Sequence, residues 1–116
     1  MWELITTELF DQWFDEQPDE LQESVLAVMH VLELKGPILG RPLVDTLNGS
    51  RYPNMKELRI QHNGMPIRAF FAFDPKRQAI ILCAGNKAGK NQRLFYKEMI
   101  EIADEQFRIH LEDLER

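Results

Sequence analysis

Residues 79–96, with the sequence AIILCAGNKAGKNQRLFY, decide how the chain is organised. The six residues from Ala79 to Ala84 are apolar or small, which predicts a short strand that is buried on both faces. Residues 85–91 contain two glycines and two asparagines and are predicted to form a loop. The loop and the residues just after it carry three cations and no acid, and a helical pattern begins at Leu94. A buried strand that delivers a basic loop to a helix is a favourable place for a functional site, but an ordinary exposed connector has the same composition.

Two more strands are predicted upstream of this one. Residues 55–61 alternate between apolar and polar side chains, and the Asn-Gly pair that follows is the strongest short signal for a hairpin. Residues 67–73 form the return strand, and an Asp-Pro turn leads from it into the buried strand. In this three-stranded antiparallel meander, Arg59 and Arg68 are expected on one face of the sheet, which a single helical layer on the other face leaves open.

Helical patterns flank the meander. Thr6 or Thr7 suits the N-cap of a short helix, and a second helix runs from Pro18 to its stop at Gly36-Pro37, which together predict an αα-hairpin. Residues 38–54 have no steady period and are expected to form an ordered but irregular loop. From about Gln92 to Leu114 the chain is predicted to be one long helix.

The fold class that follows is α+β. An N-terminal strand over residues 2–5 and the αα-hairpin pack on a three- to four-stranded antiparallel sheet, with a C-terminal helix. At 116 residues the chain is expected to be one domain, residues 1–116, with a core of its own.

Composition restricts the compartment and the class of protein. The single cysteine, Cys83, has no partner in the chain, which favours a reducing compartment. No apolar run is long enough to span a bilayer, and the N-terminus lacks the pattern of a signal peptide, so we expect a cytoplasmic protein with no membrane partner.

Charge is strongly segregated along the chain. The formal net charge is −5, but residues 41–97 contain eleven Lys and Arg and only three acids, a net charge of +8, while the rest of the chain carries −13. Local fields rather than net charge attract a polyanion, so the basic middle is a candidate surface for a phosphate backbone. The alternative is that the strands carry Lys and Arg and the helices carry Asp and Glu with no functional meaning.

Several kinds of chemistry have no matching motif. The three histidines and one cysteine show no metal-ligand spacing, and P-loop, dinucleotide-binding and serine-elbow motifs are absent from the sequence. We therefore expect no metal and no cofactor. What remains is a set of cations with one aromatic residue: Lys56, Arg59, Arg68, Lys87, Lys90, Arg93 and Tyr96.

This set suits RNA cleavage without a metal ion. The ribose 2′-OH is an internal nucleophile, so the protein needs only to orient it, move protons and stabilise charge on the phosphorane. Arginine and lysine side chains supply the charge stabilisation. A tyrosine or lysine whose pKa nearby cations pull toward neutrality would move the protons.

The order of elements and several motifs resemble one known family. The segments NMKELR, PIRAFFAFDP, and AGNKAGKNQRLFY leading into IADEQFRIHL, together with the irregular GRP loop, are similar to HigB-like toxins. These toxins form the phage-derived branch of the RelE/ParE superfamily in bacterial type II toxin–antitoxin modules. The similarity extends from Trp2 to about Leu111 and implies a RelE-like fold.

The resemblance implies a metal-independent endoribonuclease that cuts mRNA on the ribosome and yields a cyclic phosphate. It implies a cognate antitoxin, often of the helix-turn-helix type, through which alone the complex contacts DNA. Carried onto this chain, the catalytic candidates are Arg68, Lys87 and Tyr96, and the RNA-binding candidates are Lys56, Arg59, Lys90 and Arg93. The active-site histidines of some family members have no clear match.

Other functions are compatible with the same fold. One is a ParE-like toxin that inhibits gyrase by binding, and another is an inactive paralogue that only binds an antitoxin. A third is a phage accessory protein without toxic activity. The negative total charge argues for these alternatives, and the basic block argues for RNA.

Overall fold

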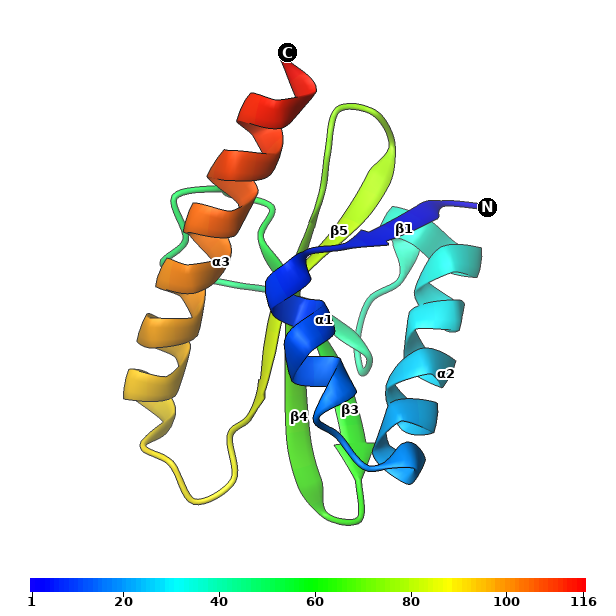
Figure 1. Cartoon of the computed structure of the whole chain (residues 1–116). Coiled ribbons are helices and arrows are strands. Elements are labelled where there is room, and N and C mark those ends of the chain that lie inside the picture. The colour runs from blue at the N-terminus through cyan, green and yellow to red at the C-terminus, as the bar shows by residue number, and fades with distance from the viewer.

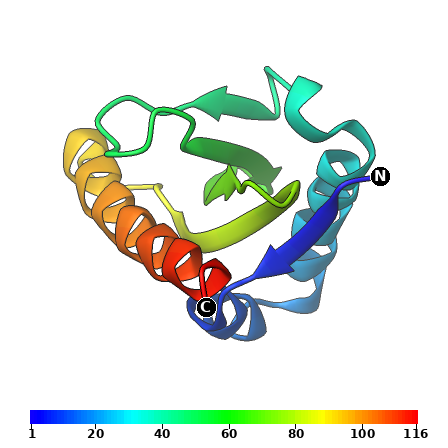
Figure 2. The same cartoon turned by 90° about the horizontal axis from the view of Figure 1, so that it is seen from above.

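The computed structural model describes residues 1–116 and has helices on both sides of one curved sheet (Figures 1 and 2). Strand β1 (Glu3–Thr6) leads into helices α1 (Glu8–Asp15) and α2 (Asp19–Lys35). A 3-10 turn (Gly36–Ile38) and a loop then lead to strand β2 (Val44–Thr46). The remaining elements, in chain order, are β3 (Lys56–His62), β4 (Met65–Phe73), β5 (Gln78–Asn86) and α3 (Gln92–Leu114). The class is α+β, as predicted.

The sheet has five strands in the order β1-β5-β4-β3-β2. The predicted antiparallel meander of β3, β4 and β5 is confirmed. The expectation of three or four antiparallel strands was wrong in two respects. The loop predicted to be irregular contains a short strand, β2, which pairs with β3. Strand β1 pairs with β5 in parallel, so the sheet is mixed. The β1–β5 pairing joins segments far apart in sequence, which local patterns do not report, and β2 is only three residues long.

Local signals place the helix ends as predicted. The Thr7 hydroxyl accepts a hydrogen bond from the Phe10 amide at 3.1 Å and donates one to the Leu82 carbonyl at 2.7 Å, so the N-cap of α1 is tied to β5. Gly36 ends α2 with φ of +60°. A Cβ atom there would lie 2.2 Å from the Trp2 indole, so both the backbone conformation and the close contact require glycine.

Two hydrophobic cores lie on opposite faces of the sheet. Helices α1 and α2 cover the first core, which includes Ala79 and Ile81 of β5. Helix α3 covers the second, which includes Ile80 and Leu82. The prediction that one sheet face would lack a helical layer was therefore wrong. The physical reason was already in the sequence, because a strand that is apolar on both faces must be covered on both.

A buried carboxylate joins the turn between β4 and β5 to α3. Asp74 accepts hydrogen bonds from the backbone amides of Lys76 and Gln78, from the Gln78 side chain and from His110 Nε2 at 2.8 Å. Burial alone would raise the pKa of Asp74, but the hydrogen bonds, led by that of His110, outweigh it and hold the pKa below its ordinary value of 3.8. The contact therefore contributes to stability only while the carboxyl is ionised.

No helix combines the length and the apolar character needed to cross a membrane.

Candidate functional site

The candidate site begins with two arginines on neighbouring strands. Arg59 of β3 and Arg68 of β4 are directly opposite each other in the antiparallel register. Directly opposite residues project from the same face of a sheet, so the predicted juxtaposition of these two side chains is confirmed. The face is the one that α3 partly covers, because Phe70, two residues after Arg68, belongs to the core under α3.

A buried glutamate lies at the centre of the cluster. Glu57 is 3% exposed, and its Oε2 accepts a hydrogen bond from Arg59 Nε at 3.0 Å. Its Oε1 accepts one from the Tyr96 hydroxyl at 2.6 Å and lies 3.6 Å from Arg68 Nε. A buried carboxylate is stable only when it is paired and hydrogen-bonded, and these three side chains provide both. Glu57 thus fixes the positions of residues from β3, β4 and α3.

The two arginines differ in how far their charges are already neutralised. Arg59 has two carboxylate partners, Glu57 and Asp45 of β2, the latter at 3.1 Å. Arg68 is more deeply buried and donates to the backbone carbonyl of Ile67 at 3.0 Å, while its Nε is buried without a hydrogen-bond partner. Unsatisfied buried donors are uncommon and costly. Arg68 has one carboxylate neighbour, Glu57 at 3.6 Å, so its charge is the less neutralised of the two.

Lys87 and Tyr96 complete the cluster from the loop and the helix that follow β5. The Lys87 ammonium nitrogen lies 5.6 Å from the centroid of the Tyr96 ring, within range of a cation–π contact. The ring also packs edge-on against Phe70 and Phe95. The residues of the basic loop and of the sheet, far apart in sequence, therefore meet at one place.

The pKa values of these two groups move in opposite directions. Burial and the charge of Arg68 lower the pKa of Lys87, in the expected direction. Burial and the hydrogen bond to Glu57 raise the pKa of Tyr96 above its ordinary value of 10.0. The sequence suggested a tyrosine or a lysine whose pKa is pulled toward neutrality. Lys87 shows a shift in this direction and Tyr96 does not, because burial and the bond to Glu57 outweigh the effect of Arg68 on the Tyr96 pKa. At neutral pH Tyr96 is therefore a protonated hydroxyl, while the lowered pKa of Lys87 means that its surroundings favour loss of its proton.

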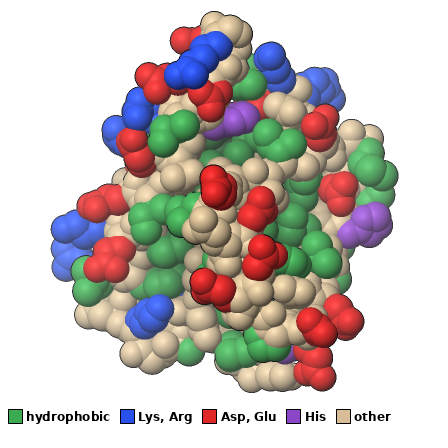
Figure 3. All heavy atoms as spheres, in the orientation of Figure 1, with side chains coloured by type: hydrophobic (Ala, Val, Ile, Leu, Met, Phe, Trp, Pro, Cys, Tyr) green, Lys and Arg blue, Asp and Glu red, His purple; other side chains and the backbone are tan.

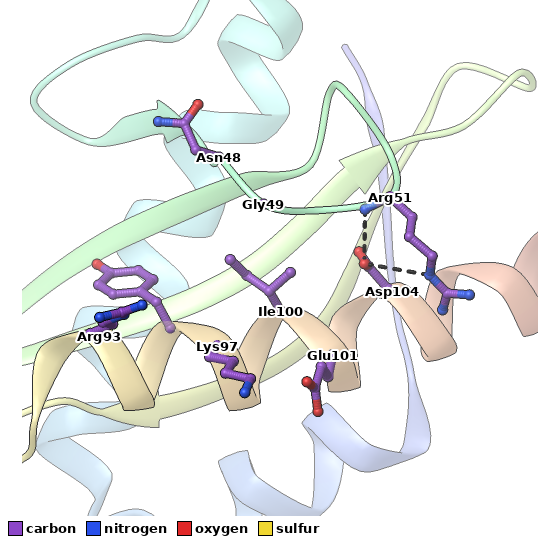
Figure 4. Close-up of a pocket in the computed structure, with 9 residues that line it drawn as sticks. Asn48, Gly49, Arg51, Arg93, Lys97, Ile100, Glu101 and Asp104 are labelled. Atoms are coloured by element: carbon purple, nitrogen blue, oxygen red, sulfur yellow. Dashed lines mark hydrogen bonds and ion pairs between the residues drawn. The ribbon is translucent and has the colours of Figure 1, made fainter.

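The other predicted residues are not all brought to the cluster. Lys56 alternates with Glu57 along β3 and so points to the opposite sheet face, where it donates to Thr46 Oγ1 at 2.9 Å. Lys90 lies over the Phe95 ring, at 5.6 Å, and lines a groove between α1 and α3. Arg93 is exposed and borders a hollow beside Tyr96 (Figure 4).

Histidine does not contribute to the cluster. His62 Nδ1 lies 2.8 Å from Ser24 Oγ, and His110 contacts Asp74 at the other end of α3. His30 lies 3.8 Å from Glu33 on α2. The groups available for proton transfer in the cluster are therefore the tyrosine, the lysine and the buried carboxylate.

Sequence reasoning missed Glu57. The signal was available, since Glu57 is one of only three acids in the basic block and lies two residues before Arg59, on the same strand face. Nothing in the sequence indicated residues 48–51 either, which form one wall of the hollow beside Tyr96. No local pattern marks that wall, because Asp104 of α3 positions it by accepting hydrogen bonds from the Ser50 hydroxyl and the Arg51 amide.

Chemically, the cluster combines the positive charge that an anion-binding surface requires with groups able to transfer protons. Arg59, Arg68 and Lys87 provide positive charge at one place, and hydrogen bonds from cations to phosphate oxygens are among the stronger ones in proteins. The Tyr96 hydroxyl and Glu57 form a short donor–acceptor pair next to these cations.

Comparison with families and curated relatives gives a consistent result. Residues 12–108 match the family described as "Phage derived protein Gp49-like (DUF891)". The chain is 50% identical over 109 residues to a Mycobacterium tuberculosis protein named "Putative toxin HigB2", covering 93% of this chain and 54% of that protein. It is 47% identical over 95 residues to "Putative toxin HigB3" of the same organism, covering 82% of this chain and 81% of the relative. The chain thus spans about half the length of the first relative and most of the second.

Solved structures show the same fold. The isolated Escherichia coli RelE toxin has a TM-score of 0.60 at 14% identity, covering 87% of this chain and 97% of that one. A mutant of E. coli RelE in the free state has a TM-score of 0.57 at 9% identity, covering 82% and 90%. At these identities the likeness establishes the fold alone, and it confirms the predicted RelE-like architecture.

Proposed function

Because this chain belongs to the Gp49-like family of phage-derived proteins and is a homologue of HigB toxins with a RelE-like fold, we propose that it is the toxin of a type II toxin–antitoxin pair and cleaves mRNA on the translating ribosome. In this proposal residues 1–116 act as one toxin domain in the cytoplasm, where the substrate is. The reaction uses the 2′-OH of the RNA and no metal ion.

One observation carries the proposal. In a protein of net charge −5, Arg59, Arg68 and Lys87 gather with Tyr96 around a single buried carboxylate. A purely structural ion pair needs one cation for each anion, whereas here the two carboxylates Glu57 and Asp45 face four cations, the exposed Arg41 included. The excess positive charge supports binding of a phosphate.

The arrangement suggests a role for each group in the cleavage. The Tyr96 hydroxyl donates its proton to Glu57, so the lone pairs of its oxygen are free to accept the proton of the ribose 2′-OH. As the 2′-oxygen attacks phosphorus, the Tyr96 proton passes to Glu57 and the 2′-OH proton passes to Tyr96. This relay needs no free tyrosinate, which agrees with the raised pKa of Tyr96.

The leaving group needs a proton and the phosphorane needs compensation for its charge. Lys87, whose pKa is lowered, gives a proton to the departing 5′-oxygen, and Arg68 stabilises the non-bridging oxygens. The P–O5′ bond breaks, and the products are a 2′,3′-cyclic phosphate and a 5′-hydroxyl. Arg59 contributes binding to the same or the neighbouring phosphate.

Induced expression in E. coli tests the proposal. Growth should stop, and primer extension should show new, in-frame mRNA 5′ ends that depend on translation. The double variant Arg68→Ala/Tyr96→Phe, expressed at matched levels, should permit growth and leave mRNA intact. Intact mRNA in cells arrested by the unchanged protein would contradict the proposal.

A gyrase-directed toxin without nuclease activity is the second candidate. The observation that favours it is the acidic net charge, which is unusual for a protein that binds a polyanion. The same expression experiment separates the two, since DNA-damage signalling with intact mRNA would indicate gyrase.

We propose a cognate antitoxin as the protein partner. Residues 1–34 contain nine acids and no Lys or Arg. In the view of Figure 3, acidic side chains line α1 between two hydrophobic patches. The patch between α1 and α3 is a groove lined by Leu9, Trp13, Met99 and Ile102 with Glu16 at its edge. An antitoxin segment with an apolar stripe and Lys or Arg beside it fits this groove, away from the cationic cluster.

Two matched variants test this partner surface. Ile102 and Ile109 are both 40% exposed on α3, but only Ile102 lines the groove. Ile102→Glu should weaken rescue by the co-expressed antitoxin and leave toxicity intact, whereas Ile109→Glu should leave both unchanged. Full rescue of the Ile102→Glu variant would show that the antitoxin binds elsewhere.

A further inference from the structure

A hollow of about 700 Å³ lies directly beside the cationic cluster. It opens between the loop that follows β2 and the side of α3 (Figure 4). Tyr96 belongs both to its lining and to the cluster. Its size is that of a small-molecule pocket. None of the roles assigned above to the reacting groups uses it.

The hollow is held open by contacts between the loop after β2 and α3. Asp104, whose side chain is 6% exposed, accepts hydrogen bonds from the Ser50 hydroxyl and from the Arg51 amide at 2.9 Å. The Arg51 guanidinium lies 3.7 Å from the same carboxylate. Tyr52 then packs edge-on against Phe107, with ring centroids 4.9 Å apart. The loop is therefore anchored on α3, and the space beside the anchor is preformed.

The lining has the character of a nucleotide site. Arg93 and Lys97 of α3 are exposed and form no ion pair within the protein. Ile100 and the Tyr96 ring supply apolar surface. Asn48 also lines the hollow from the loop; its exposed amide points away from α3 in Figure 4, and rotation of this surface side chain would bring it over the hollow. An asparagine amide offers both a donor and an acceptor, which is what hydrogen bonding to the edge of an unpaired base requires.

The acids in the lining do not neutralise the positive charge of Arg93 and Lys97. Asp104 is occupied by Ser50 and Arg51, so Glu101 is the one carboxylate left without a partner against the two free cations. Tyr96 contacts Lys87 through a cation–π pair and shares Glu57 with Arg59 and Arg68, so the hollow lies next to the cationic cluster.

We propose that this hollow binds the nucleotide next to the scissile phosphate of a single-stranded RNA substrate. The base lies on Ile100 and the Tyr96 ring with its edge at Asn48, and the phosphate of that nucleotide lies at Arg93 and Lys97. The inference rests on the proposed function and adds to it the residues that select the cleavage site. In particular, Asn48 is a specificity residue that touches the base and not the reacting atoms.

Binding of RNA that cannot be cleaved tests the site. Single-stranded 2′-O-methyl oligonucleotides of uridine, cytidine or adenosine lack the nucleophile, and fluorescence anisotropy of labelled oligonucleotides with the full chain gives affinity as a function of salt. Arg93→Ala/Lys97→Ala should weaken all three complexes about tenfold and reduce the slope of log affinity against log salt by roughly 0.7 for each lost phosphate contact. The control Lys35→Ala/Lys76→Ala removes the same charge away from the hollow and should bind like the unchanged protein.

Asn48→Ala should change the order of preference among the three oligonucleotides and leave the salt slope unchanged. In cells it should shift the positions of the mRNA 5′ ends. If the unchanged protein binds RNA and both hollow variants bind with the same affinity, slope and preference, the site is refuted while the proposed function stands. If the unchanged protein neither binds nor cuts RNA, the proposed function fails and this inference fails with it.

Discussion

The carboxylate of Glu57 should be the most sensitive single group in the cluster, and Glu57→Gln tests it. The substitution preserves the shape of the side chain and removes its charge. Arg59 keeps Asp45 at 3.1 Å, but Arg68, with a side chain 11% exposed, loses its only carboxylate neighbour. The new amide group also places a donor where Arg59 or Tyr96 donates now.

The expected loss of stability follows from these contacts. Removing one partner of a fully buried ion pair costs about 3–5 kcal/mol, and losing a hydrogen bond to a charged group costs about 1.5–3 kcal/mol. Arg59 is 35% exposed and retains a partner, so its share is smaller. We expect Glu57→Gln to lower the free energy of unfolding by about 2–3 kcal/mol, which corresponds to a decrease in Tm of roughly 10 °C.

Urea denaturation followed by tryptophan fluorescence measures this change. The matched control is Asp45→Asn, which removes a more exposed partner of the same Arg59 and of the exposed Arg41, and should lower the stability much less than Glu57→Gln. Since Glu57 helps to raise the pKa of Tyr96, the variant should also lower that pKa, seen in the ultraviolet titration of a Tyr52→Phe background. A loss below about 0.5 kcal/mol, with an unchanged tyrosine titration, would refute the view that Glu57 organises the cluster.

Four further outcomes are expected. Arg68→Ala should reduce the rate of mRNA cleavage by roughly 10²–10³-fold, the usual cost of one charge-stabilising contact, as measured by quantitative primer extension; an unchanged rate would remove Arg68 from the site. Gly36→Ala should lower the free energy of unfolding by about 1 kcal/mol or more, whereas Gly40→Ala, where an added Cβ meets nothing within 4 Å, should have little effect in the same thermal melts. The pKa of Asp74 is lower in the folded protein, so its contribution to stability is complete above its ordinary pKa of 3.8 and is lost as the pH falls through the lower folded value. Asp74→Asn should therefore make the free energy of unfolding fall less steeply at acid pH. An unchanged dependence on acid pH would contradict this. Burial raises the pKa of the Cys83 thiol to about 12, so alkylation by iodoacetamide at neutral pH should require unfolding, and rapid labelling of the native protein would show that β5 is accessible.

The pairing of Arg59 with Arg68 shows how far local pattern extends into the site. Period-two alternation assigned each arginine to a face, and the Asn-Gly turn set the register between the two strands. Both signals lie within a few residues of the side chains concerned. The pair was therefore predictable, as were the long helix from Gln92 and a threonine cap at residue 6 or 7, which the structure places at Thr7.

The partners of those arginines were not predictable in the same way. Glu57 and Tyr96 are 39 positions apart, and their contact depends on α3 crossing the sheet face at one angle and height. Lys56 and Lys90 belong to the same basic segment as Lys87. Lys56 lies on the opposite sheet face, and Lys90 lies over the Phe95 ring. Charge in the sequence does not report the direction of a side chain.

The sequence by itself determined the α+β class, the meander, the helix ends and the concentration of positive charge in the middle of the chain. These follow from side-chain periodicity, turn chemistry and capping, which act over a few residues. Only the tertiary structure decided that β1 is parallel to β5, which helices cover which face, and that Glu57 gathers Arg59, Arg68 and Tyr96 beside a preformed hollow. The reason is that burial and hydrogen bonding of one carboxylate are satisfied by groups from three separate elements, which come within reach only after the sheet and α3 have packed.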